Sequence, residues 1–183
     1  PHPVDDSVAD RARARGIPVV PGLRLRKHFA LGANLRDLWA MPRLLRDLQI
    51  DLVHCHRGQD HLVAGIAVRR QGLPVAVVRT SYEGVPLRRT LRNRYLLRRC
   101  TTRLIDISPT AATADAAAFG LGADRVPVIE APVDLSRFDP ARPRTDLRAA
   151  LGLPPDAIVA GIVARVQRRR RFDVLLAALQ HAV

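Results

Sequence analysis

The sequence predicts an α/β fold in which helices cover the faces of a parallel sheet. Short apolar runs rich in valine and isoleucine alternate along the chain with longer stretches whose apolar residues recur at helical spacing. Glycine and proline stand at several of the junctions, where turns are expected. This alternation is typical of βαβ units, whose strands pair in parallel and whose helices pack against the sheet.

The apolar runs between the helical stretches are the candidate strands. The run at 50–56 is sufficiently apolar and β-branched to be a buried central strand. The other runs are shorter and are bounded by proline, glycine or charged residues. We expect strands at 17–20, 50–56, 75–78, 103–107, 126–129 and 158–163.

Helices are expected between these strands, the first running from Asn34 with a kink at Pro42. Ser108 and Pro109 form a favourable helix start, because the hydroxyl caps free amides and proline lacks an N–H that would have no partner there. Gly120 is expected to end that helix. Further helices are expected over about 60–70, 86–99 and 146–151, and from about 172. The predicted buried stripes are Leu35, Leu38, Trp39, Leu45 and Leu48; Leu87, Leu91, Tyr95 and Leu96; and Phe172, Leu175, Leu176 and Leu179.

A proline-rich stretch divides the chain into two parts. Residues 131–156 hold five of the prolines and only one short predicted helix, which indicates a linker between domains. We expect residues 1–135 to form an N-terminally incomplete Rossmann-like domain and residues 136–156 to form the linker. Residues 157–183 are expected to begin a second, truncated Rossmann-like domain with its first strand and helix.

The formal net charge of +13 is the strongest compositional feature. It has two interpretations: attraction to phosphate, in nucleic acid, anionic lipid or a nucleotide substrate, or a coding bias toward arginine. Lys27 is the only lysine, so nearly all of the positive charge comes from arginine. We therefore assign function to particular arginines and not to the charge as a whole.

The remaining composition excludes several classes of protein. A hydrophobic content of 48% argues against wholesale disorder. No apolar run reaches the roughly 18 residues that a membrane-spanning helix needs. Cys55 and Cys100 lie far apart and in no Cys-x-x-Cys pair, so neither a disulfide framework nor a structural zinc site is expected. A reducing, cytoplasmic setting fits this cysteine usage best.

A cluster of arginines follows the last predicted strand, over residues 165–171. Ligands of parallel sheets bind beyond the carboxyl ends of the strands, where helix N-termini point free amides at them. Arginine suits a diphosphate there, because its planar guanidinium makes bidentate contacts with phosphate oxygens. A solvated basic loop and a nucleic-acid patch remain alternatives for this turn.

Polar residues also follow two earlier strands, at the edge of the sheet where a substrate is expected. His56 ends one strand, with Arg57 and His61 just beyond it. Arg79 and Tyr82 come at and after the end of the next strand. Because parallel strands end at one edge, we expect these residues to lie in one cleft. Arg79 is suited to a phosphorylated or carboxylated acceptor, with a surface ion pair as its alternative.

Two neighbouring residues have simpler interpretations. His54 is expected to be a hydrogen-bonded core histidine, and Asp60 is at least as well explained as the cap of the following helix. A metal site formed by His56, Asp60 and His61 is disfavoured, since the spacing matches no known ligand motif.

Four segments resemble, in order, motifs of one enzyme family. They are the strand 51–56, with Asp-Leu-Val-His-Cys-His; the helix start Ile-Ser-Pro at 107–109; the segment 128–140, with Val-Asp and Arg-Phe; and the strand, turn and helix at 162–176. Over roughly residues 15–183 the chain resembles glycosyltransferase family 4. The departures are Ala131 and Pro132 for Asn-Gly, Ala164 and Arg171 for glycines, and Tyr82 where many members have a histidine.

The resemblance implies a GT-B fold of two Rossmann-like domains and a retaining transfer of sugar from a nucleotide-diphosphate sugar to an acceptor hydroxyl. It implies that Arg165 and Arg170 hold the donor diphosphate and that His56, Arg57, His61, Arg79 and Tyr82 line the acceptor side. No metal or other cofactor is expected, the nucleotide sugar being a co-substrate. The family's Glu-x7-Glu donor segment lies further downstream, so this segment alone is expected to be inactive.

The expected partners are a nucleotide sugar and a glycan or lipid-linked acceptor, as in cell-envelope synthesis. The arginine-rich helix at 86–99 is either a peripheral contact with the anionic inner face of the cytoplasmic membrane or a solvated face. The alternative function is a basic α/β module that binds nucleic acid or phosphate without catalysis. An aromatic content of 4% argues against nucleic acid, since stacking side chains are scarce.

Overall fold

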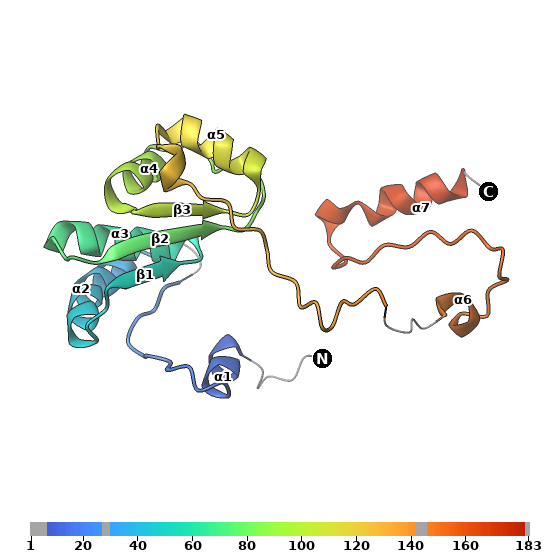
Figure 1. The fold of residues 1–183 in the computed structure, drawn as a ribbon, viewed down its shortest axis with the longest axis horizontal. Coiled ribbons are helices and arrows are strands. Elements are labelled where there is room, and N and C mark those ends of the chain that lie inside the picture. Colours follow the sequence, from blue (N-terminus) through green and yellow to red (C-terminus); the bar gives the residue numbers. More distant parts are fainter. Residues whose placement is uncertain (1–6, 27–29, 142–145, 182–183) are drawn as a thin grey trace. The chain divides into compact units, whose positions relative to one another are not determined.

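The computed structural model describes residues 7–26, 30–141 and 146–181. The chain forms two compact units, Pro1–Val133 and Asp134–Val183. The first unit contains a three-stranded sheet of β1 (Leu52–Cys55), β2 (Ala76–Ser81) and β3 (Arg103–Asp106), in the order β1-β2-β3. Both pairings are parallel, so the three arrows of Figure 1 point the same way. The predicted α/β fold with a parallel sheet is therefore confirmed.

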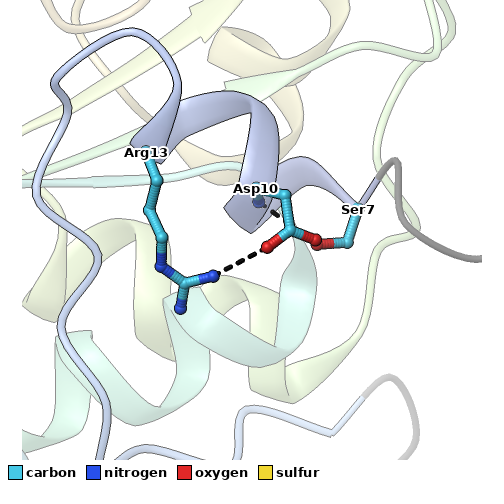
Figure 2. A network of polar contacts seen from close by, with 3 residues as sticks. All are labelled: Ser7, Asp10 and Arg13. Carbon is cyan, nitrogen blue, oxygen red and sulfur yellow. Dashed lines mark hydrogen bonds and ion pairs between the residues drawn. The ribbon is translucent and has the colours of Figure 1, made fainter.

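Helix α1 (Val8–Arg13) opens the described chain and was not predicted. Ser7 caps it by accepting a hydrogen bond from the Asp10 amide, and the Asp10 carboxylate pairs with Arg13 at 2.8 Å (Figure 2). The strand predicted at 17–20 is wrong, since these residues are irregular. The Ile17 amide instead bonds back to the Ala12 carbonyl, and Pro18 lacks the donor that a ladder needs.

Helix α2 (Leu31–Asp47) is present as predicted and contains Pro42, but its predicted buried stripe is mostly wrong. Met41 and Leu45 are buried, whereas Trp39 is 82% exposed and Leu35 is also exposed. The buried face is centred on Asp37, which is fully buried, and so lies on a different side of the helix from the predicted stripe. The Asp37 carboxylate accepts the amides of Arg24 and Leu25, at 3.0 and 2.8 Å, and ties the preceding segment to α2.

Helix α3 (Gly58–Gln71) follows β1 and ends at Gly72, whose φ of 58° is the left-handed conformation that glycine favours. Its buried face joins α2 and the sheet in one core cluster. Gly65 lets Cys100 approach closely, because a Cβ atom at Gly65 would lie 3.1 Å from the Cys100 Cβ. The cluster comprises Met41, Leu45, Cys55, Val63, Ala64, Ala67, Val68 and Val77.

The helix predicted at 86–99 is shorter than expected and changes type. Helix α4 (Leu91–Tyr95) begins after Thr90, whose hydroxyl accepts the Asn93 amide. It continues as a π-helical turn, η1 (Leu96–Cys100). The predicted stripe is only half right, since Leu96 is buried but Leu91 and Tyr95 are exposed.

Helix α5 (Pro109–Phe119) begins and ends where predicted. The Ser108 hydroxyl accepts the Ala111 amide, and Gly120 closes the helix with a φ of 62°. The strand predicted at 126–129 is reduced to a single parallel bridge between Val128 and Asp106, preceded by the short turn η2 (Ala123–Arg125). The second core cluster comprises Leu97, Leu104, Ala112, Phe119, Leu121 and Val126.

The second unit contains α6 (Leu147–Ala150), η3 (Arg168–Arg170) and α7 (Phe172–Gln180). Both predicted helices are thus present. The strand predicted at 158–163 is not formed, and Ile158 and Val163 are fully exposed. A strand exists only as part of a ladder, and the described residues of this unit offer no second strand to pair with. Among the described residues, no helix is long and apolar enough to span a membrane.

Candidate functional site

The carboxyl edge of the sheet brings His56 and Tyr82 together. The His56 Nδ1 atom lies 2.8 Å from the Tyr82 hydroxyl, and the two rings stack with their centroids 5.7 Å apart. The ring of His54 is 4.3 Å from that of His56, and its Nε2 atom bonds the Thr80 hydroxyl at 2.7 Å. His54 is exposed, so the prediction of a core histidine is wrong, although its ring is hydrogen-bonded. Desolvation and then the nearby His56 lower the His54 pKa.

Asp60 organises the start of α3 directly beyond His56. Its carboxylate accepts the backbone amides of His56 and Arg57, at 3.1 and 2.8 Å, so the capping interpretation of Asp60 is confirmed. The exposed Arg57 donates from its guanidinium to the Leu25 carbonyl at 3.2 Å. No group of three metal-ligating side chains occurs among the residues that the structure describes.

Arg79 lies on the opposite face of the sheet from His56 and Tyr82, because side chains alternate along a strand. It is half-buried, and its Nη1 atom is 3.2 Å from the Nδ1 atom of His61. A Cβ atom at Gly58 would lie 3.6 Å from the same Nη1, which places the guanidinium beside the first turn of α3. The positive end of the α3 dipole and the Arg79 charge therefore coincide there.

The Arg79 guanidinium is incompletely paired. Its buried Nε atom has no hydrogen-bond partner in the part of the chain that the structure describes. Burial, opposed mainly by the charge of Asp60, lowers the Arg79 pKa. Arginine remains a cation even so, because its ordinary pKa is far above neutrality. A half-buried cation of this kind favours a bound anion.

His61 is buried, with 1% of its surface exposed. Its Nε2 atom is 2.7 Å from the Thr101 hydroxyl, and its Nδ1 atom faces Arg79. Burial first, and then the charges of Arg79 and Arg92, lower the pKa of His61 to about 3. The ring is therefore neutral at physiological pH. Of the five residues predicted on the acceptor side, His61 is the buried one, and it contacts Arg79.

The two predicted donor residues, Arg165 and Arg170, are exposed and lie on one short segment of the second unit. Arg170 ends the turn η3, and α7 begins two residues later. Arg171 between them has a φ of 52°, in the region that favours glycine. The backbone at Arg171 therefore has the left-handed conformation that glycine favours, although the residue is arginine.

Comparison with known proteins decides the family. The sequence profile described as Glycosyltransferase Family 4 matches residues 2–137. The chain belongs to glycosyltransferase family 4. A glycosyltransferase from Rickettsia africae superposes with a TM-score of 0.59 at 13% identity, covering 84% of this chain and 41% of that one. This likeness confirms the GT-B-like Rossmann fold of the family 4 chain.

Two curated proteins illustrate its relatives. The D-inositol 3-phosphate glycosyltransferase of Streptomyces scabiei is 30% identical over 70% of this chain and 31% of its own length. The UDP-Gal:alpha-D-GlcNAc-diphosphoundecaprenol alpha-1,3-galactosyltransferase of Escherichia coli is 28% identical over 90% of this chain and 43% of its own length. The family 4 chain therefore spans less than half the length of these relatives.

Sequence reasoning missed a buried pair of aspartates in the family 4 chain, Asp106 at the end of β3 and Asp115 in α5. Asp106 and Asp115 are both fully buried. Asp115 accepts the Leu87 amide at 2.9 Å, but neither carboxylate oxygen of Asp106 has a partner among the described residues. Burial first, and then the charge of Asp115, raise the Asp106 pKa to about 6. Ser81 opposes this rise, although its hydroxyl does not reach hydrogen-bonding geometry. The one available signal was a lone aspartate within the apolar run 104–107.

Replacing Asp106 by asparagine is expected to stabilise the protein at pH 7. The pKa of Asp106 is raised on folding, so its contribution to stability is complete below the unfolded pKa of about 3.8 and is lost as the pH rises through about 6. The amide carries no charge to bury, so Asp106→Asn should raise the free energy of unfolding by roughly 1 to 2 kcal/mol at pH 7. This gain should shrink by about 1 kcal/mol at pH 5.

Denaturant unfolding at the two pH values measures this difference. Asp124→Asn, at an exposed aspartate, is the matched control and should show no comparable change. A destabilised Asp106→Asn variant at pH 7 would contradict the prediction, because it would mean that the ionised carboxylate has a favourable partner.

Proposed function

We propose that the full-length protein is a retaining glycosyltransferase that moves a sugar from a nucleotide-diphosphate sugar to an acceptor hydroxyl. The observation that carries this proposal is the family 4 match over residues 2–137. The names of the relatives support it: one acts on D-inositol 3-phosphate and another uses UDP-Gal. The GT-B-like fold and the polar carboxyl edge of the sheet agree with a substrate site at that edge.

On the donor side, we assign the diphosphate to Arg165 and Arg170. Departure of the nucleoside diphosphate develops negative charge on phosphate oxygens, and fixed cations stabilise that charge without reorganising. The start of α7 adds free backbone amides next to Arg170. Since arginine supplies the counter-charge, we propose that no metal or other cofactor takes part.

On the acceptor side, the first turn of α3 is the centre of the proposed site. His56 and Tyr82 offer hydrogen bonds to sugar or inositol hydroxyls from one side. Arg79 and Arg57 offer positive charge near the same turn. The names of both relatives include a phosphorylated acceptor, an inositol phosphate and a diphosphate-linked lipid. We therefore propose an acceptor that carries phosphate, used in cell-envelope synthesis at the cytoplasmic face of the membrane.

Thermal unfolding of the full-length protein with a panel of UDP- and GDP-sugars tests the donor assignment. At least one nucleotide sugar should raise the melting temperature, because a ligand of the native state stabilises it. NMR of the product with that donor should show retained anomeric configuration. Absence of stabilisation by every nucleotide sugar, together with salt-dependent binding of random DNA, would instead support a basic binding module.

Replacing Arg79 by methionine is expected to weaken use of a phosphorylated acceptor. Methionine keeps much of the buried stem but removes the guanidinium, and a hydrogen bond to a charged group contributes about 1.5–3 kcal/mol. The acceptor KM should therefore rise by about tenfold or more, while the donor KM stays the same. Initial rates with D-inositol 3-phosphate and a neutral acceptor, inositol, measure the effect.

Arg103→Ala is the matched control for this prediction. It removes the same charge at the start of β3, where Arg103 is in register with Val78 and so lies on the opposite face of the sheet from Arg79. Arg103 pairs with Asp124 at 4.0 Å and donates to the Thr102 carbonyl at 3.1 Å. If Arg79→Met and Arg103→Ala gave the same acceptor KM, the proposed role of Arg79 would be wrong.

A further inference from the structure

A continuous chain of hydrogen bonds runs from the π-helical turn η1 to Arg79. The Thr101 hydroxyl is 2.8 Å from the Leu96 carbonyl, five residues earlier, and 2.7 Å from the Nε2 atom of His61. The other ring nitrogen of His61 is 3.2 Å from Nη1 of Arg79. The wide turn places Thr101 within reach of α3, and π-helical turns are often found at functional sites.

The direction of each hydrogen bond in this chain follows from its ends. The Leu96 carbonyl only accepts, so the Thr101 hydroxyl must donate its proton to it. The same hydroxyl oxygen then has only lone pairs to offer, so His61 must donate from Nε2. A neutral imidazole with its proton on Nε2 has a lone pair on Nδ1. That lone pair accepts an N–H of the Arg79 guanidinium.

The neutral state of His61 fits this arrangement, because a protonated ring could not accept a hydrogen bond from a cation. Burial and the positive charges of Arg79 and Arg92 together hold the His61 pKa at about 3. The Thr101 end of this chain of hydrogen bonds is also held in place. Arg125 donates to the Leu97 and Thr101 carbonyls, at 2.8 and 2.5 Å, and so secures the turn that carries the Thr101 hydroxyl.

An arginine side chain is flexible, and a site gains affinity when such a side chain is already held in its binding conformation. His61 accepts one N–H of Arg79, which leaves the remaining Nη donors of the guanidinium for a ligand beside the first turn of α3. We propose that His61, fixed by Thr101, is a positioning residue that orients Arg79 to bind the anionic group of the acceptor. This inference rests on the acceptor role proposed above for Arg79.

Two amide substitutions of His61 separate orientation of Arg79 from simple packing. An asparagine amide reaches about as far as Nδ1 of a histidine, so H61N keeps an acceptor for Arg79 and loses the Thr101 contact. A glutamine amide reaches about as far as Nε2, so H61Q keeps the Thr101 contact and loses the acceptor for Arg79. Both variants bury an uncharged polar side chain at the same position, which makes them matched controls for stability.

The readout is the affinity of the full-length protein for D-inositol 3-phosphate, measured by calorimetry, with phosphate-free inositol as the comparison. H61Q should weaken binding of the phosphate compound by about fivefold to tenfold and leave inositol binding as it was. H61N should restore most of the phosphate-dependent affinity. In an Arg79→Met background, H61Q should cause no further loss, because the two changes remove one interaction.

Equal losses in H61Q and H61N, or a loss from H61Q that persists in the Arg79→Met background, would overturn the inference and leave His61 a packing residue. Nitrogen-15 NMR of the histidine rings gives a ligand-independent test. His61 should stay neutral with its proton on Nε2 from pH 5 to 8, and a proton on Nδ1 would also overturn the inference. If the wild-type protein bound D-inositol 3-phosphate and inositol equally, the proposed acceptor role of Arg79 would be wrong. The inference about His61 would then be wrong too, because it rests on that role. The NMR result would show separately whether the hydrogen-bond chain is as described.

Discussion

Replacing Arg165 by alanine in the full-length protein is expected to lower kcat/KM for sugar transfer by about 100-fold. The proposed leaving group is a nucleoside diphosphate, whose charge grows as the glycosidic bond breaks. Removing one fixed group that stabilises such developing charge typically costs about 100-fold to 1,000-fold in rate. Arg165 is exposed and precedes the turn η3, so its guanidinium is accessible to a phosphate.

The measurement is the initial rate at a saturating and at a low concentration of the nucleotide sugar. If Arg165 acts mainly in the transition state, its removal lowers kcat. If it binds the ground state and the transition state equally, its removal raises only KM. Arg148→Ala is the charge control, since Arg148 lies in α6 of the same unit and its guanidinium makes a weak contact, 3.5 Å, with the Ala157 carbonyl. If both variants lost activity equally, general positive charge and not Arg165 would explain the effect.

Replacing Phe119 by alanine is expected to destabilise the first unit by about 3–5 kcal/mol. Phe119 is 2% exposed and ends α5, where it packs in the cluster that contains Leu97 and Leu104. Removing the ring leaves a cavity between α5 and β3, because surrounding side chains relax only in part. A loss of this size approaches the total stability of many domains, so much of the protein should be unfolded at 37 °C.

Urea unfolding of the full-length protein, followed by circular dichroism, measures this loss. Phe119→Leu is the matched variant, since it keeps most of the apolar volume and should cost clearly less than the alanine change. If alanine and leucine cost the same small amount, under about 1 kcal/mol, Phe119 would not be the anchor of this cluster.

The elements that the sequence predicted well are those with local signals. Gly72 and Gly120 end helices in the left-handed conformation, and the Ser108 hydroxyl caps α5. The parallel pairing follows from the alternation of strands and helices. The same alternation explains why His56 and Tyr82 could be placed together before any contact was known, since both follow the carboxyl end of a strand.

The features that the sequence missed depend on tertiary contacts. Helix α2 has apolar residues on most of its circumference, so periodicity could not show that its buried face is centred on Asp37. The strand alternation that separates Arg79 from His56 was available in the sequence, but the burial of His61 against Thr101 was not. The π-helical turn that brings those two together has no reliable local signature. The run at 158–163 has the composition of a strand, but composition supplies no partner strand.

Both cysteines of this chain are free and lie in the interior, Cys55 in the sheet and Cys100 against Gly65. Burial raises the pKa of Cys55 to about 12 and also raises that of Cys100. Since the thiolate is the species that reacts, neither sulfur is a target for alkylating reagents at neutral pH. Neither cysteine of residues 1–183 should therefore compete in such labelling. A single cysteine introduced at an exposed position such as Val166, next to Arg165, would be selectively addressable by a maleimide fluorophore, placing a reporter beside the proposed diphosphate site.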